Sequence, residues 1–161
     1  MAGPEGAGAQ FEELDGSGLR IGIVAARWND DIVERLVDGA HRGLDRLDVR
    51  AEDRTLAWVP GSFELALGAK AMAERPGVDA VIALGAVIRG ETVHFELVAN
   101  EAARGIQDAQ LATGVPIAFG VLATEDRAQA EARSGGPGSH NVGEQCAAVA
   151  VEMARLLNRL A

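Results

Sequence analysis

Short apolar segments and amphipathic helical patterns alternate along the whole chain, and this alternation constrains the fold more than any other feature. Four segments rich in β-branched or small apolar residues are predicted as strands: 20–26 (RIGIVAA), 54–59 (RTLAWV), 80–88 (AVIALGAVI) and 116–122 (PIAFGVL). Residues at helical spacing follow each segment, and a last helix is predicted from Asn141 to Arg159. Strands that alternate with helices form a parallel sheet with right-handed crossovers.

The predicted fold class is therefore α/β, a flavodoxin-like three-layer sandwich in which helices flank both faces of a four-stranded parallel sheet. The length of 161 residues fits one domain. We expect residues 1–12 to form a flexible N-terminal tail and residues 13–161 to form this domain. A flavodoxin-type FMN carrier is disfavoured, because residues 26–30 (ARWND) do not resemble a Ser/Thr/Gly-rich phosphate loop.

The net charge and the single cysteine limit the classes of partner and the cellular compartment that fit this chain. The net charge of −9 argues against nucleic acid or an anionic membrane as the main partner. The apolar runs are too short to span a bilayer, and residues 1–10 lack the charged start and apolar middle of a signal peptide. Cys146 is the one cysteine, which fits a reducing compartment. We expect a cytoplasmic protein.

The segment 88–95, IRGETVHF, follows the third predicted strand and leads into a helical pattern. Free backbone N–H groups and the helix dipole at such a junction attract an anion, and the Thr92 hydroxyl can add a donor. His94 falls in the first helical turn, where the positive end of the dipole favours a neutral imidazole that can act as a base. The alternative is an ordinary turn in which Thr92 caps the helix and His94 faces solvent.

Several further residues have both a binding interpretation and a structural one. Trp28 can stack on a planar heterocycle or can cover the core. Glu64 can accept hydrogen bonds from ligand hydroxyl groups or can favour the helix dipole, and Ser62 can cap the same helix. Arg133 can pair with a phosphate or can balance the dipole at a helix C-terminus. Cys146 lies in an alanine-rich helix and is predicted to pack in the core and not to react.

Taken together and in order, these segments resemble the 6,7-dimethyl-8-ribityllumazine synthase family, which catalyses the penultimate step of riboflavin biosynthesis. The matching segments are 21–30 (IGIVAARWND), 59–70 (VPGSFELALGAK), 83–106 (ALGAVIRGETVHFELVANEAARGI), 116–133 (PIAFGVLATEDRAQAEAR) and 141–153 (NVGEQCAAVAVEM). They cover nearly the whole chain after the N-terminal tail. The combination of PGSFE with VIRGxTxHF is highly specific to this family.

The resemblance implies an enzyme, a transferase that condenses 5-amino-6-(D-ribitylamino)uracil with 3,4-dihydroxy-2-butanone 4-phosphate. Phosphate and water are released, and no cofactor or metal takes part. The resemblance also implies which residues bind the ribitylaminouracil. Trp28 is expected to stack on the pyrimidine, and the backbone of Ala86, Val87 and Ile88 is expected to contact the pyrimidine edge. The remaining implied residues are Ser62, Phe63 and Glu64, at the ribityl chain and ring, and Phe119.

The same resemblance implies which residues bind the phosphate and which residue transfers protons. Glu91 and Thr92 are expected to hold the phosphate through N–H and hydroxyl groups, and His94 is expected to be the catalytic residue that transfers protons. Phe119 and Arg133 occupy positions that the family contributes from a neighbouring subunit, Arg133 to the phosphate.

One position departs from the family's pattern. The family carries Asn/Asp-Lys-Gly before its last helix, whereas this sequence reads Asn141-Val142-Gly143. The missing cation leaves Arg133 and the helix N-terminus to hold the phosphate, which predicts weaker binding of the butanone phosphate or a slower reaction. The alternative function is a catalytically weakened homologue that binds lumazine or flavin, or that forms a shell.

Sites shared between subunits imply an oligomer. The resemblance implies a homopentamer or a 60-subunit icosahedral shell built from pentamers. Because the loop 134–140 differs from the compact glycine-rich form associated with shells, we predict the pentamer and leave the shell open. Riboflavin synthase is a candidate protein partner of such an enzyme.

Overall fold

A parallel four-stranded sheet with the strand order β2-β1-β3-β4 forms the centre of the molecule in a computed structural model, which describes residues 14–161. The strands are β1 (Ile21–Ala26), β2 (Arg54–Val59), β3 (Ala80–Ile88) and β4 (Ile117–Thr124). The four predicted strands and the parallel sheet are thus confirmed. The predicted tail, residues 1–12, lies outside the described residues.

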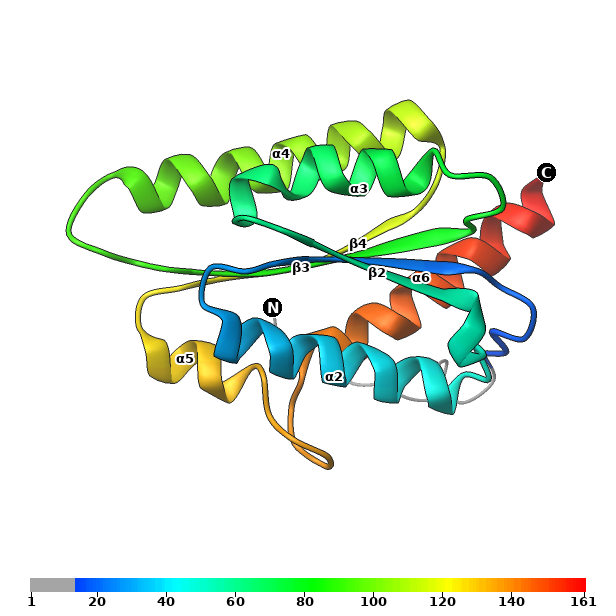
Figure 1. Cartoon of the computed structure of the whole chain (residues 1–161), viewed down its shortest axis with the longest axis horizontal. Helices are drawn as coiled ribbons and strands as arrows, with labels where there is room; N and C mark the ends of the chain where they lie inside the picture. The colour runs from blue at the N-terminus through cyan, green and yellow to red at the C-terminus, as the bar shows by residue number, and fades with distance from the viewer. Residues whose placement is uncertain (1–13) are drawn as a thin grey trace.

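Helices cover both faces of the sheet and complete the three predicted layers (Figure 1). The helices are α2 (Asp30–Arg46), α3 (Leu65–Ala73), α4 (His94–Thr113), α5 (Arg127–Ala132) and α6 (Val142–Leu160), with short 3-10 helices η1 (Ala51–Asp53) and η2 (Ser62–Glu64). In Figure 1, α3 and α4 lie above the sheet, whereas α2, α5 and α6 lie below it. No helix within residues 14–161 is long and apolar enough to cross a membrane.

The central strand β3 shows why the apolar runs fold as they do. Successive side chains of a strand point to opposite faces of a sheet. Ile82 and Leu84 of β3 pack in the cluster formed with α2 and α6, whereas Val81 and Ala83 pack in the cluster formed with α3 and α4. Because both faces are covered, a continuous apolar run is more stable here than an alternating one.

The order of the strands places a binding crevice at one end of the sheet. From β1 the chain crosses to β2 on one side, and β3 then pairs with the other side of β1. In open parallel sheets, ligands bind outside the carboxyl ends of the strands at such a point of reversal. These ends lie at the left of Figure 1, where the loops after β1 and β3 lead into α2 and α4.

The predicted starts of the first and fourth strands and both ends of the last helix are each off by one residue, and two other differences are larger. The sequence predicts that the fourth strand ends at Leu122, but β4 continues to Thr124 because Thr124 pairs with Ile88 at the end of β3. The sequence also predicts that the helix after β2 begins with Ser62 as its cap. That prediction is wrong, because Ser62 opens the 3-10 helix η2 and α3 begins at Leu65 with no side-chain cap.

Candidate active site

The residues after β1 form the first wall of a pocket at the carboxyl end of the sheet. The backbone N–H of Arg27 donates to the Val59 carbonyl oxygen at 2.9 Å, and that of Trp28 donates to the Pro60 carbonyl oxygen at 3.2 Å. These bonds join the segment after β1 to the end of β2 and the residue that follows it, so they fix the backbone at Trp28. Its side chain lines the pocket and is 74% exposed. The indole therefore offers an open aromatic surface.

Asn29 links this wall to the end of β3. Its backbone is left-handed, with φ of 60°, a conformation that asparagine adopts more readily than most residues. The sequence favours Asn29, Asp30 or Asp31 as a side-chain cap of α2. Asn29 is indeed the N-cap residue, but its side chain makes no capping bond. Instead, Nδ2 donates to the Ala86 carbonyl oxygen at 2.8 Å.

The segment after β2 forms the second wall. Ser62 is buried, and its Oγ atom has no hydrogen-bond partner among the described residues although it lines the pocket. Gly85 of β3 permits this close approach, because a Cβ atom at position 85 would lie 2.5 Å from the Ser62 oxygen. Phe63 and Glu64 beside it are exposed and also line the pocket. The hydroxyl and the carboxylate can therefore both bond to a polar ligand.

The loop between β3 and α4 forms the third wall. Residues 90–93 are exposed, and within residues 14–161 no protein group accepts a hydrogen bond from their backbone N–H groups. The Thr92 hydroxyl oxygen accepts a long bond, 3.4 Å, from the His94 N–H, and Val93, not Thr92, is the N-cap of α4. Free N–H groups at the start of a long helix, together with its dipole, make a site that attracts an anion.

These walls enclose one open pocket of about 640 Å³, a size typical of small-molecule sites. It brings together nine of the predicted site residues: Trp28, Ser62, Phe63, Glu64, Ala86, Val87, Ile88, Thr92 and His94. Ala86 is buried, while Val87 and Ile88 are half-buried, so the end of β3 forms the floor.

Three predicted site residues do not line this pocket. Glu91 lies on the loop of the third wall with its side chain exposed, Phe119 lies on β4 with 47% of its side chain exposed, and Arg133 is the exposed C-cap residue of α5. The family resemblance assigns Phe119 and Arg133 to a neighbouring subunit. Their absence from the pocket of a single chain leaves that assignment a prediction.

Seven pocket residues have no binding role in the sequence interpretation, namely Asn29, Pro60, Gly61, Gly90, Phe95, Leu97 and Val98. Helical periodicity could have found two of them. Leu97 and Val98 follow His94 by three and four residues, so they share its face of α4. Nothing in the local pattern distinguishes Asn29 from an ordinary capping residue, because its partner Ala86 lies 57 residues away.

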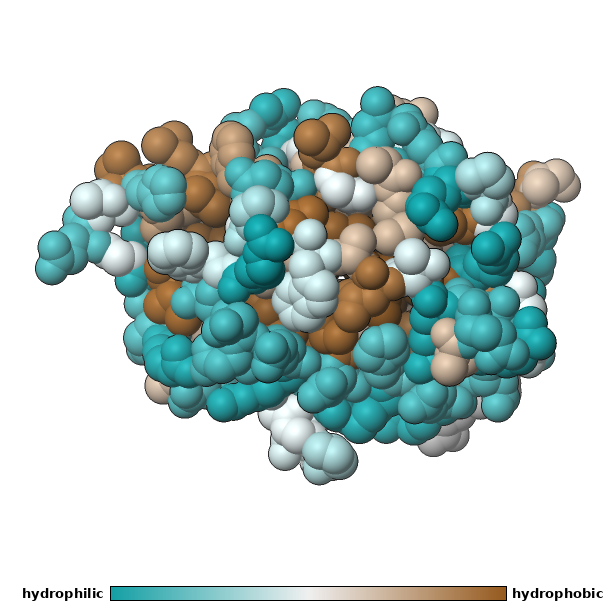
Figure 2. All heavy atoms as spheres, in the orientation of Figure 1, coloured by the Kyte–Doolittle hydropathy of each residue, from teal (hydrophilic) through white to brown (hydrophobic). Residues whose placement is uncertain are grey.

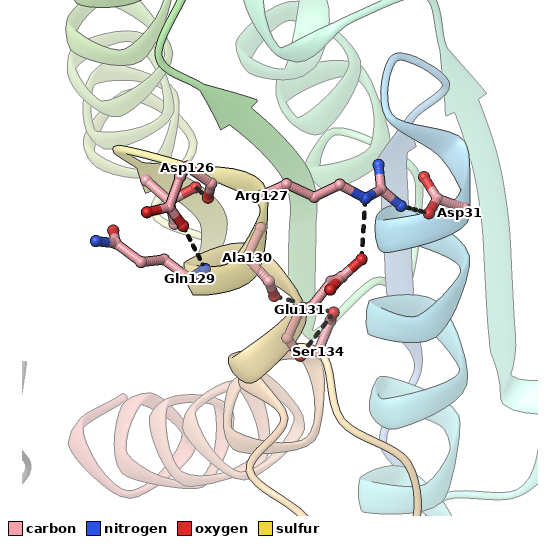
Figure 3. A network of polar contacts seen from close by, with 8 residues as sticks. Asp31, Asp126, Arg127, Gln129, Ala130, Glu131 and Ser134 are labelled. Atoms are coloured by element: carbon pink, nitrogen blue, oxygen red, sulfur yellow. Dashed lines mark hydrogen bonds and ion pairs between the residues drawn. The ribbon is translucent and has the colours of Figure 1, made fainter.

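Helix α5, which is followed by Arg133, is anchored by a polar network (Figure 3). Asp126 accepts a capping bond from the Gln129 N–H at 2.8 Å. Arg127 binds Glu131 on its own helix at 2.9 Å and also binds Asp31 in the first turn of α2. The hydrogen bond from Arg127 holds the pKa of Asp31 below its ordinary value. The network joins α5 to the part of α2 that follows the first pocket wall.

Arg133 and Val142 are direct neighbours in the structure. The Val142 N–H donates to the Arg133 carbonyl oxygen at 2.9 Å. The Arg133 side chain donates to the Gln129 carbonyl oxygen at 2.9 Å and is otherwise exposed. Val142 is half-buried and packs on the core at the start of α6. The position at which the family carries lysine thus adjoins Arg133.

Within residues 14–161, neither Cys146 nor a cluster of metal ligands adds a reactive group to the pocket. Cys146 is buried in the core, as predicted, and burial raises the pKa of its thiol to about 12, which keeps it protonated. Among the described residues, no group of three or more His, Cys, Asp or Glu side chains is placed to hold a metal ion.

The pocket combines three chemical abilities. Trp28 and Phe63 offer aromatic surfaces for a flat heterocycle. The start of α4 attracts an anionic group. His94, the first residue of α4, is exposed to the pocket and can accept and donate protons. Such a site can hold a heterocycle and an anionic second substrate together and can move protons between them.

Comparisons of the sequence with known proteins indicate one family. The chain matches the family model described as 6,7-dimethyl-8-ribityllumazine synthase over residues 18–158. Two similar proteins, from two strains of Thermus thermophilus, both carry the name 6,7-dimethyl-8-ribityllumazine synthase. Each is 48% identical to this chain over 147 residues, which cover 91% of this chain and 93% of the relative.

Proposed function

The chain belongs to the 6,7-dimethyl-8-ribityllumazine synthase family, and from that premise we propose that it condenses 5-amino-6-(D-ribitylamino)uracil with 3,4-dihydroxy-2-butanone 4-phosphate. The product is 6,7-dimethyl-8-ribityllumazine, and the reaction is the penultimate step of riboflavin biosynthesis. The observation that carries the proposal is the meeting of aromatic surfaces, free N–H groups and one imidazole in a single pocket.

The uracil substrate occupies the side of the pocket formed by the ends of β1, β2 and β3. Trp28 stacks on the pyrimidine, and the backbone of residues 86–88 hydrogen-bonds to its edge. Glu64 accepts hydrogen bonds from the ribityl hydroxyl groups, and the Ser62 hydroxyl donates to or accepts from them, beside the ring of Phe63. The buried Ser62 hydroxyl without a protein partner among the described residues supports this placement, since a bond to the ligand would satisfy it.

The phosphate of the second substrate binds at the start of α4. The N–H groups of Glu91 and Thr92 and the Thr92 hydroxyl donate to its oxygens. The absence of protein acceptors for these N–H groups among the described residues supports the assignment. A helix of twenty residues adds the positive end of its dipole at the same point.

His94 transfers the protons that the condensation requires. The 5-amine attacks the ketone carbon, and loss of water gives an imine. Removal of a proton from the neighbouring CHOH carbon expels phosphate and leaves an enol, which takes up a proton at its terminal carbon to become a ketone. The ribitylamino nitrogen attacks this new ketone carbon, and loss of a second water closes the ring. Each step moves a proton, and one imidazole beside the phosphate site can serve them all. Holding both substrates in one pocket supplies much of the remaining acceleration.

The site is completed by a neighbouring copy of the chain in a homopentamer, which contributes Phe119 and Arg133. Exposed apolar side chains support an oligomer. Leu56 and Trp58, 41% and 37% exposed, lie on the edge strand β2, and Phe119 lies on the opposite edge strand β4. Figure 2 shows hydrophobic residues in the middle of the view, in the region where Figure 1 draws β2, and a second group at the upper left. A larger shell of pentamers and an association with riboflavin synthase stay open.

We expect the enzyme to act in the cytoplasm, because Cys146 has no partner for a disulfide within the chain. The second candidate function is a weakened homologue that binds lumazine or flavin, and it rests on Val142 alone.

A substrate assay separates the two candidates. Purified protein is mixed with both substrates, and formation of lumazine is followed by its absorbance. We expect turnover well above the spontaneous condensation. Tight binding of lumazine without turnover above that background would overturn the enzyme and favour the weakened homologue.

A further inference from the structure

Arg89 is the first residue after β3, and it contacts three segments around the pocket. Its backbone N–H donates to the Thr124 carbonyl oxygen at 2.9 Å, which extends the pairing of β3 with β4. Its Nε atom donates to Glu125 at 2.6 Å, and its Nη1 atom donates to Glu96 in the first turn of α4. The guanidinium also lies over the ring of Phe95, 4.3 Å from the ring centroid. One side chain thus joins the ends of β3 and β4 to the start of α4.

The effect of this cluster is geometric more than energetic. The side chains of Arg89 and its two carboxylate partners are between 37% and 63% exposed, and exposed ion pairs add little to stability. The bonds to Glu125 and Glu96 raise the pKa of Arg89, and Arg89 in turn lowers the pKa of Glu96. Arg89 and Glu96 are therefore both charged near neutral pH, and their contact persists where the enzyme works.

The loop that Arg89 spans has little else to hold its shape. Residues 90–93 are exposed, and a Cβ atom at Gly90 would meet nothing within 4 Å. Their N–H groups have no protein acceptor among the described residues. The loop is therefore defined by its two ends, which are β3 on one side and the first turn of α4 on the other. Arg89 ties these ends together through Glu96 and Phe95.

We propose that Arg89 is a positioning residue that holds the N–H groups of residues 90–93 and the His94 imidazole in the geometry needed by the phosphate substrate. Arg89 is not among the residues that line the pocket, so it acts through Phe95, which does line it. The role rests on the proposed function, because it concerns the phosphate half of that site.

The test is steady-state kinetics of Arg89→Met with each substrate varied in turn. We expect the KM for the butanone phosphate to rise about tenfold, since small misplacements of binding groups are costly, while the KM for the uracil substrate changes by less than about twofold. Arg89→Lys keeps the charge but loses the planar fork, so it should recover only part of the loss. An equal rise in both KM values, or no rise, would overturn the positioning role.

Arg104→Met is the matched control. Arg104 also binds two carboxylates, Glu101 and Asp108, but on the surface of α4 away from the pocket lining. We expect its kinetics to equal those of the unmodified chain. A rise in the phosphate KM as large as that of Arg89→Met would show a general effect of surface charge and would overturn the proposal.

A second measurement does not depend on turnover. The Leu97 N–H donates to the Val93 carbonyl oxygen at 3.2 Å, the bond that opens α4. Hydrogen exchange of this amide should be faster in Arg89→Met than in Arg104→Met. If the unmodified chain has no activity, the proposed function falls, and unchanged exchange at Leu97 would then overturn the role of Arg89 as well.

Discussion

The side-chain nitrogen of Asn29 lies 2.8 Å from the carbonyl oxygen of Ala86, so one hydrogen bond joins the segment after β1 to the end of β3. The contact lies where the strand order reverses, between the Trp28 wall and the floor of the pocket. The left-handed backbone of Asn29 directs its amide toward β3 instead of capping α2. This bond therefore joins the first wall of the pocket to its floor.

Substitutions of Asn29 separate its backbone role from its side-chain role. Asn29→Gly keeps the left-handed conformation and loses the bond to Ala86, whereas Asn29→Ala loses both. A left-handed backbone costs an ordinary L-residue roughly 1–2 kcal/mol, so Asn29→Ala should unfold at lower urea concentration than Asn29→Gly. Both variants should bind the uracil substrate more weakly than the unmodified chain. Equal stability of the two variants would contradict the backbone argument.

His94→Ala should slow the condensation while it retains binding of the uracil substrate. A positioned acid–base residue contributes roughly 10²–10⁴-fold in rate, and the aromatic wall that binds the pyrimidine is left in place. Single-turnover rates and fluorescence titration measure the two effects. His140→Ala is the control, because His140 is exposed and outside the pocket lining. A His94→Ala rate equal to that of the control would refute the catalytic role.

Mixed oligomers test whether Arg133 serves a neighbouring pocket. Chains carrying His94→Ala and chains carrying Arg133→Ala should each be slow alone. If the contact is head-to-tail between subunits, co-assembly in equal amounts restores both residues in roughly one quarter of the sites.

The control for that experiment mixes His94→Ala with Glu64→Gln. Both residues line the pocket of one chain, so no mixed site can regain both. Recovery of activity in the first mixture and not in the second supports the shared site. No recovery in either would contradict a contribution of Arg133 to a neighbouring pocket.

Val142→Lys should lower the KM for the butanone phosphate, because position 142 adjoins Arg133 and a second cation would favour the dianion. The gain should be about fivefold, corresponding to roughly 1 kcal/mol. A small loss of thermal stability should accompany it, since Val142 packs on the core and a cation at the first residue of α6 opposes the helix dipole. Val142→Met is the control, because methionine has a side chain of similar length to lysine but carries no charge. If both variants change the KM equally, charge is not the cause.

The layers and strands of this fold could be predicted because the sequence carries them locally. Every residue from Ala80 to Ile88 is either apolar or glycine. A continuous apolar run of this length is typical of a parallel strand that helices cover on both faces. The segment IRGETVHF likewise places Thr92 and His94 at a strand-to-helix junction, where free backbone N–H groups can attract an anion. The order of the motifs was enough to indicate the family, which the comparisons confirm.

Tertiary structure alone decided how the pocket is held together. In their local sequence, Asn29 and Ser62 resemble N-cap residues of helices. Arg89 resembles an ordinary surface charge. Their contacts in the structure depend on residues brought near by folding: Ala86 for Asn29, Gly85 for Ser62, and Glu125 for Arg89. Periodicity reports which face of an element is buried, but it contains no information about the distance between residues on different elements. Local sequence patterns thus indicate the sheet, its covering helices and the chemical groups at its edge, whereas the packing of β1 against β3 brings particular groups into contact.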